Sequence, residues 1–250
     1  MAGTEETWER LDRAFESALR SVVEPRRPPV VLFSGGVDSG LLAWELRRMR
    51  GASLVTVGLA GSDDLEQAAR AVPRIGLPWV GRTLEDDDLA EVEETVRPEL
   101  VGVPGPRRGI FVALAAGIAS APTGPLLCGQ GADELFFGYA HYRGLSAEMA
   151  AARSSADLRC LLEEDWPRTR RIATLWEREV QAPYLDPGFV LAASGVPAVE
   201  RLPRGLTKVF FRRWALHRGL PESLAERPKR ALQYGSGIDR WLRRHHRRAP

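Results

Sequence analysis

Two short stretches of the chain combine glycines with side chains that bind phosphate or a metal ion. Residues 34–39 read Ser-Gly-Gly-Val-Asp-Ser, and residues 129–134 read Gly-Gln-Gly-Ala-Asp-Glu. In the first stretch, Gly35 and Gly36 let backbone N–H groups approach an anion closely, and the two serine hydroxyls add donors. A carboxylate among phosphate donors is repulsive unless a divalent cation lies between them, so Asp38 indicates Mg²⁺. The first stretch therefore predicts a site for a phosphate chain and a metal ion.

The second stretch places two adjacent acids after its glycine turn. We predict that Asp133 shares the coordination of Mg²⁺ with Asp38. Glu134 is then either a further ligand or a residue that contacts a ligand without binding the metal itself. The alternative is structural: acids are favourable in the first turn of any helix, and a glycine turn followed by serine is a common helix start. The standard phosphate-loop and dinucleotide-binding patterns of glycines are absent from the sequence.

Short apolar runs precede both glycine turns, as expected of buried parallel strands. These runs are residues 30–33 and 126–128, and two more strands are expected at 54–59 and 79–80. Helical patterns alternate with the strands, at residues 8–22, 40–50, 64–72, 83–96 and 110–120, with 101–109 as a loop. The alternation predicts an α/β fold with a doubly wound parallel sheet, followed by a mostly helical carboxy-terminal part.

Composition describes a chain that can bury a sizeable core. Of its 250 residues 44% are apolar and 27% charged, and the longest apolar stretch, residues 109–121, is too short to span a bilayer. Cys128 and Cys160 do not form a metal or disulfide pattern. We expect a cytoplasmic protein without a membrane partner.

Charge is distributed unevenly along the chain. Residues 201–250 hold 14 Lys and Arg against 3 Asp and Glu, although the whole chain carries only +2. Such a basic segment faces an anion such as a nucleotide, a pyrophosphate or an RNA backbone, or it is a solvated helix face.

Both glycine stretches resemble motifs of a known family. Residues 34–39 match the pyrophosphate loop (PP-loop) of the N-type ATP pyrophosphatases, which have an adenine nucleotide alpha hydrolase-like fold. Residues 129–139 resemble the Gly-Glu-Gly-x-Asp-Glu-Leu-Phe-Gly-Gly-Tyr stretch of the asparagine synthetase synthetase domain. Residues 183–186 are similar to that family's Pro-Phe-Leu-Asp, and residues 227–237 to its late lysine motif. We divide the chain into an amino-terminal amphipathic helix, 1–24, and an asparagine synthetase-like ATP-binding domain, 25–250.

The resemblance implies an ATP-dependent carbon–nitrogen ligase. In this family a substrate carboxylate attacks the α-phosphate of ATP, which gives an acyl-adenylate and pyrophosphate, and ammonia then displaces AMP; aspartate is the main acceptor. The residues implied to bind ATP and pyrophosphate are Phe33, Ser34, Gly35, Gly36, Asp38, Ser39, Val57, Cys128 and Gly129. Asp38 and Asp133 are implied to hold Mg²⁺, and the implied catalytic residues are Asp133, Glu134 and Lys229, of which Lys229 steadies the leaving pyrophosphate.

The sequence departs from the family pattern at several positions. Gln130 stands where the family has Glu, Phe137 replaces a Gly and Gln181 replaces an Arg; Ala2 occupies the place of the glutaminase cysteine. We therefore expect a stand-alone form that uses free ammonia or ammonia from a separate glutaminase subunit. A homo-oligomer is left open, and nucleic acid is not expected as a partner.

Two other functions remain as alternatives. One is a PP-loop enzyme that adenylates tRNA, which the basic last fifth of the chain motivates. The other is a non-catalytic homologue that binds a nucleotide or a partner, which Gln130 motivates. Arg107 and Arg108 are candidates to meet a substrate carboxylate, whereas the four histidines lack the spacing of metal ligands.

Overall fold

The computed structural model describes residues 2–23, 27–49, 51–203, 206–227 and 232–246. Its strands are β1 (Val30–Leu32), β2 (Ser53–Gly58), β3 (Trp79–Thr83), β4 (Leu126–Leu127) and β5 (Val180–Gln181). Its helices up to the last strand are α1 (Ala2–Val22), α2 (Val37–Met49), α3 (Asp63–Ile75), α4 (Asp86–Val96), η1 (Arg97–Leu100), α5 (Gly105–Ser120), α6 (Ala132–Leu135), η2 (Ala140–Tyr142), α7 (Ala147–Cys160), the π-helical η3 (Leu161–Asp165) and α8 (Trp166–Thr174). After β5 follow η4 (Pro183–Leu185), α9 (Pro187–Ser194), α10 (Ala198–Arg201), α11 (Val209–His217), α12 (Glu222–Ala225), α13 (Leu232–Gly235) and α14 (Ile238–His246).

The strands form one parallel sheet in the order β3-β2-β1-β4-β5. The chain moves outward in one direction from β1 to β3, then returns to the other side of β1 with β4. The order therefore reverses between β1 and β4. In open parallel sheets, ligands bind in the crevice at such a reversal, outside the carboxyl ends of the two strands. Both glycine turns lie at those strand ends.

Helices cover both faces of the sheet. On one face Val31, Leu54 and Leu127 pack in a core with α1, α2 and α3; on the other, Val30, Val55 and Leu126 pack with α4, α5 and α14. Neighbouring residues of a strand point to opposite faces, which is why one continuous apolar run supplies two cores. The doubly wound sheet predicted from the sequence is confirmed.

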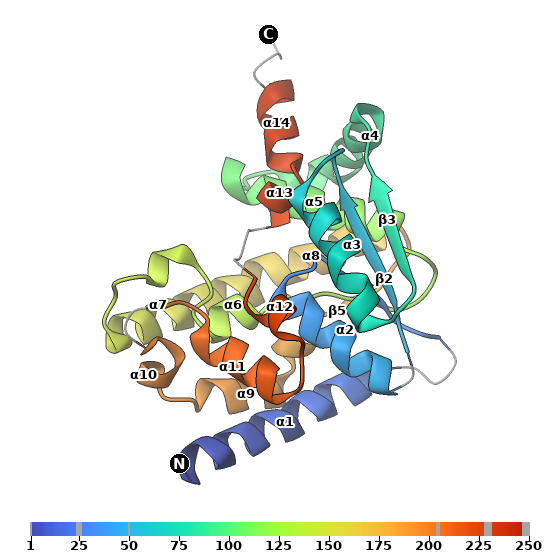
Figure 1. Ribbon diagram of the computed structural model, residues 1–250. Coiled ribbons are helices and arrows are strands. Elements are labelled where there is room, and N and C mark those ends of the chain that lie inside the picture. Colours follow the sequence, from blue (N-terminus) through green and yellow to red (C-terminus); the bar gives the residue numbers. More distant parts are fainter. Residues whose placement is uncertain (1, 24–26, 50, 204–205, 228–231, 247–250) are drawn as a thin grey trace.

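The carboxy-terminal half is mostly helical, as predicted. In Figure 1, α6, α7, α10 and α11 form a group on the left, beside the sheet, while α1 runs along the bottom and α14 stands at the top. A third, smaller core holds Phe137 and Tyr142 in this group. None of the helices in the described ranges is long and apolar enough to cross a membrane.

The structure corrects several predicted boundaries. The strand expected at 79–80 extends to Thr83, so the acidic helix begins at Asp86 and not at 83. The segment 101–109, expected as a loop, enters α5 at Gly105, because Pro106 is compatible with the first helical turn. The strand β5 was not predicted, since a two-residue pairing carries almost no periodic signal.

Candidate active site

The first glycine turn is closed by its own hydroxyls and lies against α3. The Ser34 N–H donates to the Ser39 hydroxyl at 3.2 Å, and the Gly36 N–H donates to the Ser34 hydroxyl at 3.4 Å. Gly35 has φ +71°, and a Cβ there would lie 2.9 Å from the backbone nitrogen of Ala68 in α3. Only glycine combines this backbone angle with so close an approach.

Arg227 holds the same turn from outside. Its guanidinium donates to the Ser34 carbonyl at 2.7 Å and to the Asp63 carboxylate at 2.7 Å, and it lies 3.5 Å from a carboxylate oxygen of Asp64. The side chain is only 10% exposed. The carboxy-terminal segment thereby fastens the turn to the start of α3.

The second turn touches the first. A Cβ on Gly129 would lie 3.0 Å from Cβ of Asp38. Gly131 has φ +99°, and a Cβ there would lie 2.5 Å from Leu185 Cδ2. Gly138 gives room to a carboxylate in the same way, because a Cβ there would overlap Asp133 Oδ1 at 1.8 Å. Gly129 and Gly138 thus leave room for the side chains of Asp38 and Asp133, respectively.

One buried ammonium group lies between these two carboxylates. Nζ of Lys208 is 2.7 Å from Asp38 Oδ2, 2.5 Å from Asp38 Oδ1 and 2.6 Å from Asp133 Oδ1. The lysine side chain is 2% exposed. Burial lowers the pKa of Lys208, and the Asp38 charge opposes that change. Asp38 and Asp133, predicted to share a Mg²⁺ ion, both contact the Lys208 ammonium group in this structure.

The composition of the chain holds a signal for Lys208 that motif analysis did not use. The sequence contains 33 arginines and only two lysines, Lys208 and Lys229. A lysine in so arginine-rich a chain indicates a place that needs a compact ammonium group, because the planar guanidinium of Arg is not interchangeable with it. Lys229, the predicted catalytic lysine, lies outside the described residues.

A cavity of about 220 Å³ opens beside the two turns. Of the predicted site residues it is lined by Phe33, Ser34, Asp38, Ser39, Val57, Cys128, Gly129, Asp133 and Glu134. Gly35 and Gly36 are in the turn itself but are not part of this lining. Gln233 of α13 also lines the cavity, and its buried Oε1 has no hydrogen-bond partner within the described ranges.

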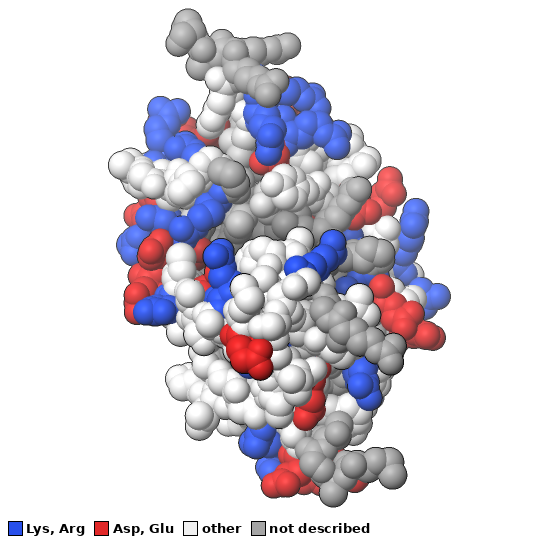
Figure 2. All heavy atoms as spheres, turned by 90° about the vertical axis from the view of Figure 1, so that its left-hand side faces the viewer, with Lys and Arg blue, Asp and Glu red and all other residues white. Residues whose placement is uncertain are grey.

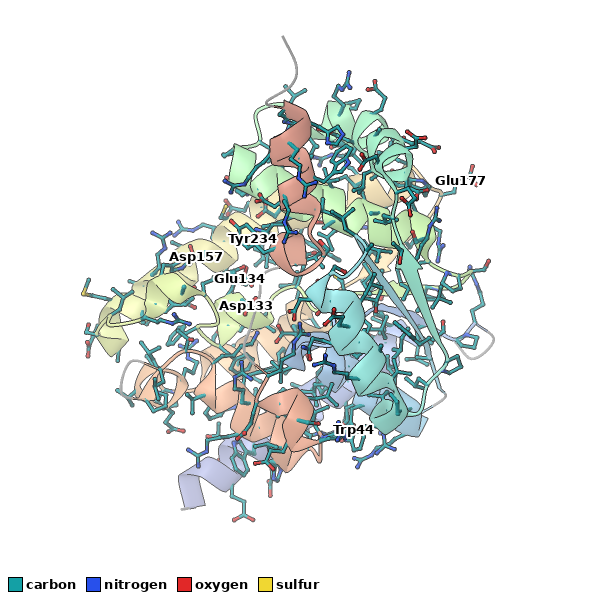
Figure 3. The ribbon with its side chains drawn as sticks, turned by 45° about the horizontal axis from the view of Figure 1, so that its top comes forward. Trp44, Asp133, Glu134, Asp157, Glu177 and Tyr234 are labelled. Carbon is teal, nitrogen blue, oxygen red and sulfur yellow. The ribbon has the colours of Figure 1, made fainter. Side chains whose placement is uncertain are left out.

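Glu134 and Tyr139 form a buried pair at one side of the cavity. The Tyr139 hydroxyl donates to Glu134 Oε1 in a short contact. Burial raises the pKa of Glu134, while the hydrogen bond from Tyr139 lowers it. Figure 3 shows Asp133 and Glu134 next to each other, with Asp157 of α7 close by.

The π-helical turn η3 supplies a further acid, Asp165, to the cavity. Leu161 and Asp165, at its two ends, line the cavity, and Arg107 of α5 contacts the Asp165 carboxylate. A π-helical turn inside a longer helix is rare and is often found at functional sites. Arg108 instead pairs with Glu93 of α4 at 3.8 Å, away from this lining.

The donor set fits a magnesium ion bound together with phosphates. Mg²⁺ in nucleotide sites takes one or two carboxylates and completes its shell with phosphate and water oxygens. Asp38 and Asp133 both reach the position of a single cation, and the turn beside them presents hydroxyls and N–H groups. No group of three or more His, Cys, Asp and Glu suited to a metal occurs among the described residues.

Comparison with known proteins places the chain in a family. The family model described as asparagine synthase matches residues 10–159 and 148–249. The chain belongs to the asparagine synthase family. A putative glutamine-hydrolysing asparagine synthetase from Methanocaldococcus jannaschii is 26% identical over 95% of this chain and 51% of the relative. The glutamine-hydrolysing asparagine synthetase of Gallus gallus is 27% identical over 88% of this chain and 42% of the relative.

This chain therefore spans about half the length of the curated relatives it matches. Among solved structures, NMN synthetase from Francisella tularensis matches with a TM-score of 0.42 and 10% identity, over 92% of this chain and 76% of that one. A TM-score this low adds no weight to the assignment, which depends on the family match and on the sheet.

The departures from the asparagine synthase pattern have structural counterparts. Gln130 lines the cavity, and its Oε1 is 3.6 Å from the thiol of Cys128, whose pKa burial raises to about 12. Phe137 is fully buried with φ +53°, and the Arg201 guanidinium lies 4.4 Å from its ring centre. Gln181 pairs with the second turn through its carbonyl, which accepts from the Cys128 N–H at 3.0 Å.

The basic carboxy-terminal helix lies away from the cavity. Trp241 of α14 donates to Asp86 at 2.8 Å, and His246 is 2.7 Å from Glu93, so α14 rests on α4. Basic side chains of its last turn gather near the top of the face in Figure 2. Among the helices α11 to α14, only α13 contributes residues to the cavity lining within the described ranges.

Proposed function

We propose that this protein is an ATP-dependent, AMP-forming ligase that adenylates a carboxylate and transfers ammonia to it. The observation that carries the proposal is the meeting of two glycine turns at the β1–β4 reversal, with Asp38 and Asp133 around one cation position. Membership of the asparagine synthase family supports an ATP-dependent ligase.

The first turn binds the outer phosphates of ATP. The N–H groups of the turn and the hydroxyls of Ser34 and Ser39 are the donors, and the amino end of α2 adds a favourable dipole. Mg²⁺, held by Asp38 and Asp133, would neutralise charge on the phosphates when bound. Lys229 stabilises the departing pyrophosphate, and Arg227, two residues before it, fixes the turn.

The acceptor lies on the side of Glu134 and Asp165. Both carboxylates line the cavity, so they suit an ammonium group of the acceptor, and Arg107 beside Asp165 suits a carboxylate that does not react. This pairing of opposite charges favours an amino acid, of which aspartate is the first to test. Tyr139 holds Glu134 in place for that contact.

Ammonia is free or comes from a separate glutaminase subunit. A second cavity of about 740 Å³ lies between α1, α8 and β5, and Leu185 lines it. Leu185 also lies against the second turn, where a Cβ on Gly131 would be 2.5 Å from Leu185 Cδ2. A small neutral molecule in this cavity would therefore be close to the second turn.

Product analysis tests this function. The protein is incubated with ATP, Mg²⁺, ammonium and L-aspartate, and then with each of the other amino acids, and AMP and pyrophosphate are measured against Asp38→Ala. We expect AMP and pyrophosphate in equal amounts with one acceptor. Turnover that depends on tRNA and not on any amino acid would favour the tRNA-adenylating alternative. Nucleotide binding without turnover would favour the non-catalytic one.

A further inference from the structure

Lys208 occupies the position expected for a metal ion. Its Nζ lies within 2.7 Å of oxygens from both Asp38 and Asp133, and it has almost no exposure to solvent. The residue has φ +62°, a left-handed conformation that is costly for a residue with a side chain. It immediately precedes α11, so the strained backbone aims the side chain inward from the helix start.

The two carboxylates need a cation in order to stay together. Like charges repel where water is partly excluded, and the Asp38 and Asp133 side chains are only 21% and 17% exposed, so loss of the cation between them is destabilising. In the described structure the Lys208 ammonium supplies that cation, and its charge offsets one of the two negative charges. The Asp38, Asp133 and Lys208 side chains together keep one net negative charge, so a divalent ion delivered by a nucleotide is still favoured there.

We propose that, in the protein without nucleotide, the Lys208 ammonium group takes the place of the metal ion between Asp38 and Asp133. Its ammonium holds Asp38 and Asp133 at a bridging separation, and it keeps free divalent ions from that position until a nucleotide brings its own metal. The inference rests on the proposed function only for the assignment of these two carboxylates as metal ligands. A lysine suits this role because its flexible four-carbon stem can withdraw, whereas a guanidinium would be fixed by its fork of donors.

Manganese titration of the nucleotide-free full chain tests the proposal. Free Mn²⁺ is followed by its electron paramagnetic resonance signal, which is lost when the ion binds. We expect weak binding without saturation in the wild type, and one ion per chain, bound at least about tenfold tighter, in Lys208→Met. In Lys208→Met with Asp133→Asn the gained binding should disappear. Lys229→Met removes the only other lysine and should not gain binding.

Thermal unfolding gives a second measurement. Without Lys208 the two carboxylates repel, so Mn²⁺ should raise the unfolding midpoint of Lys208→Met while leaving that of the wild type unchanged. If the wild type itself binds one Mn²⁺ through Asp38 and Asp133 without nucleotide, the proposal is wrong, and this result does not require any variant to fold. A folded Lys208→Met that gains no binding would also overturn it. None of these measurements depends on ATP turnover, so an inactive protein would leave the result readable.

Discussion

The two halves of the cavity are built in different ways. The half proposed for the nucleotide consists of two backbone turns at the ends of β1 and β4, where glycines permit contacts that no other residue allows. The half proposed for the acceptor is lined by side chains from α5, α6 and η3, including Glu134 and Asp165, and Arg107 contacts Asp165 from outside this lining. A site built from backbone groups binds the phosphates that all ATP-dependent enzymes use. A site built from side chains changes with a few substitutions and so sets the specificity for the acceptor.

The largest loss of activity is expected when a charge in the nucleotide half is removed. Asp133→Asn removes a carboxylate proposed to hold Mg²⁺, so we expect AMP formation to fall about 10²- to 10³-fold with every acceptor. Asp87→Asn, which alters an exposed acid on α4, is the matched control and should retain full activity. An Asp133→Asn protein that is impaired with only one acceptor would place Asp133 in the acceptor half instead.

Substitution of Gly35 distinguishes a loss of ATP binding from a loss of stability. Gly35 and Gly76 both have left-handed φ angles, +71° and +73°, but only Gly35 lies against a neighbouring backbone. We expect Gly35→Ala to weaken ATP binding about tenfold or more, measured by calorimetry. Gly76→Ala should cost about 1–2 kcal/mol of stability and leave ATP binding unchanged. Equal loss of ATP binding in both variants would contradict the proposed close fit of the turn.

Substitution of Arg107 tests whether acceptor binding can be changed without changing ATP binding. Arg107→Met removes the cation beside Asp165, and we expect the KM for the acceptor to rise about tenfold while the KM for ATP stays within about twofold. Arg171→Met, which breaks a pair with Glu99 near the surface, is the control. A rise in the KM for ATP alone would show that the two halves are not separable in this way.

Tyr139 should have the smallest effect and a distinct pH signature. Its hydroxyl lowers the pKa of Glu134, which burial raises, so Tyr139→Phe should raise that pKa further. Glu134 would then become protonated at a higher pH, and the acidic limb of the rate profile should move to higher pH. Tyr142→Phe removes a hydroxyl that donates to Asp157 at 2.8 Å and should leave that limb in place. A profile unchanged in Tyr139→Phe would mean that ionised Glu134 is not needed.

The backbone turns could be predicted from the sequence, whereas the side chains that reach them from elsewhere in the chain could not. The sheet and both turns follow from apolar runs that end in glycines, and these are local signals. Lys208 and Arg227 reach the first turn from 170 and 193 residues further along the chain, so no local spacing places them there. Asp165 reaches the cavity through a π-helical turn, which has no sequence pattern of its own. The unusual scarcity of lysine was the available signal for Lys208.

Oxygen transfer from the acceptor to AMP tests the central claim most directly. The protein is given ATP, Mg²⁺, ammonium and amino acids labelled with ¹⁸O in their carboxyl groups, and AMP is analysed by mass spectrometry. Attack of the carboxylate on the α-phosphate predicts AMP that carries one ¹⁸O atom, with pyrophosphate as the second product. Unlabelled AMP, or ADP and inorganic phosphate, would contradict the account.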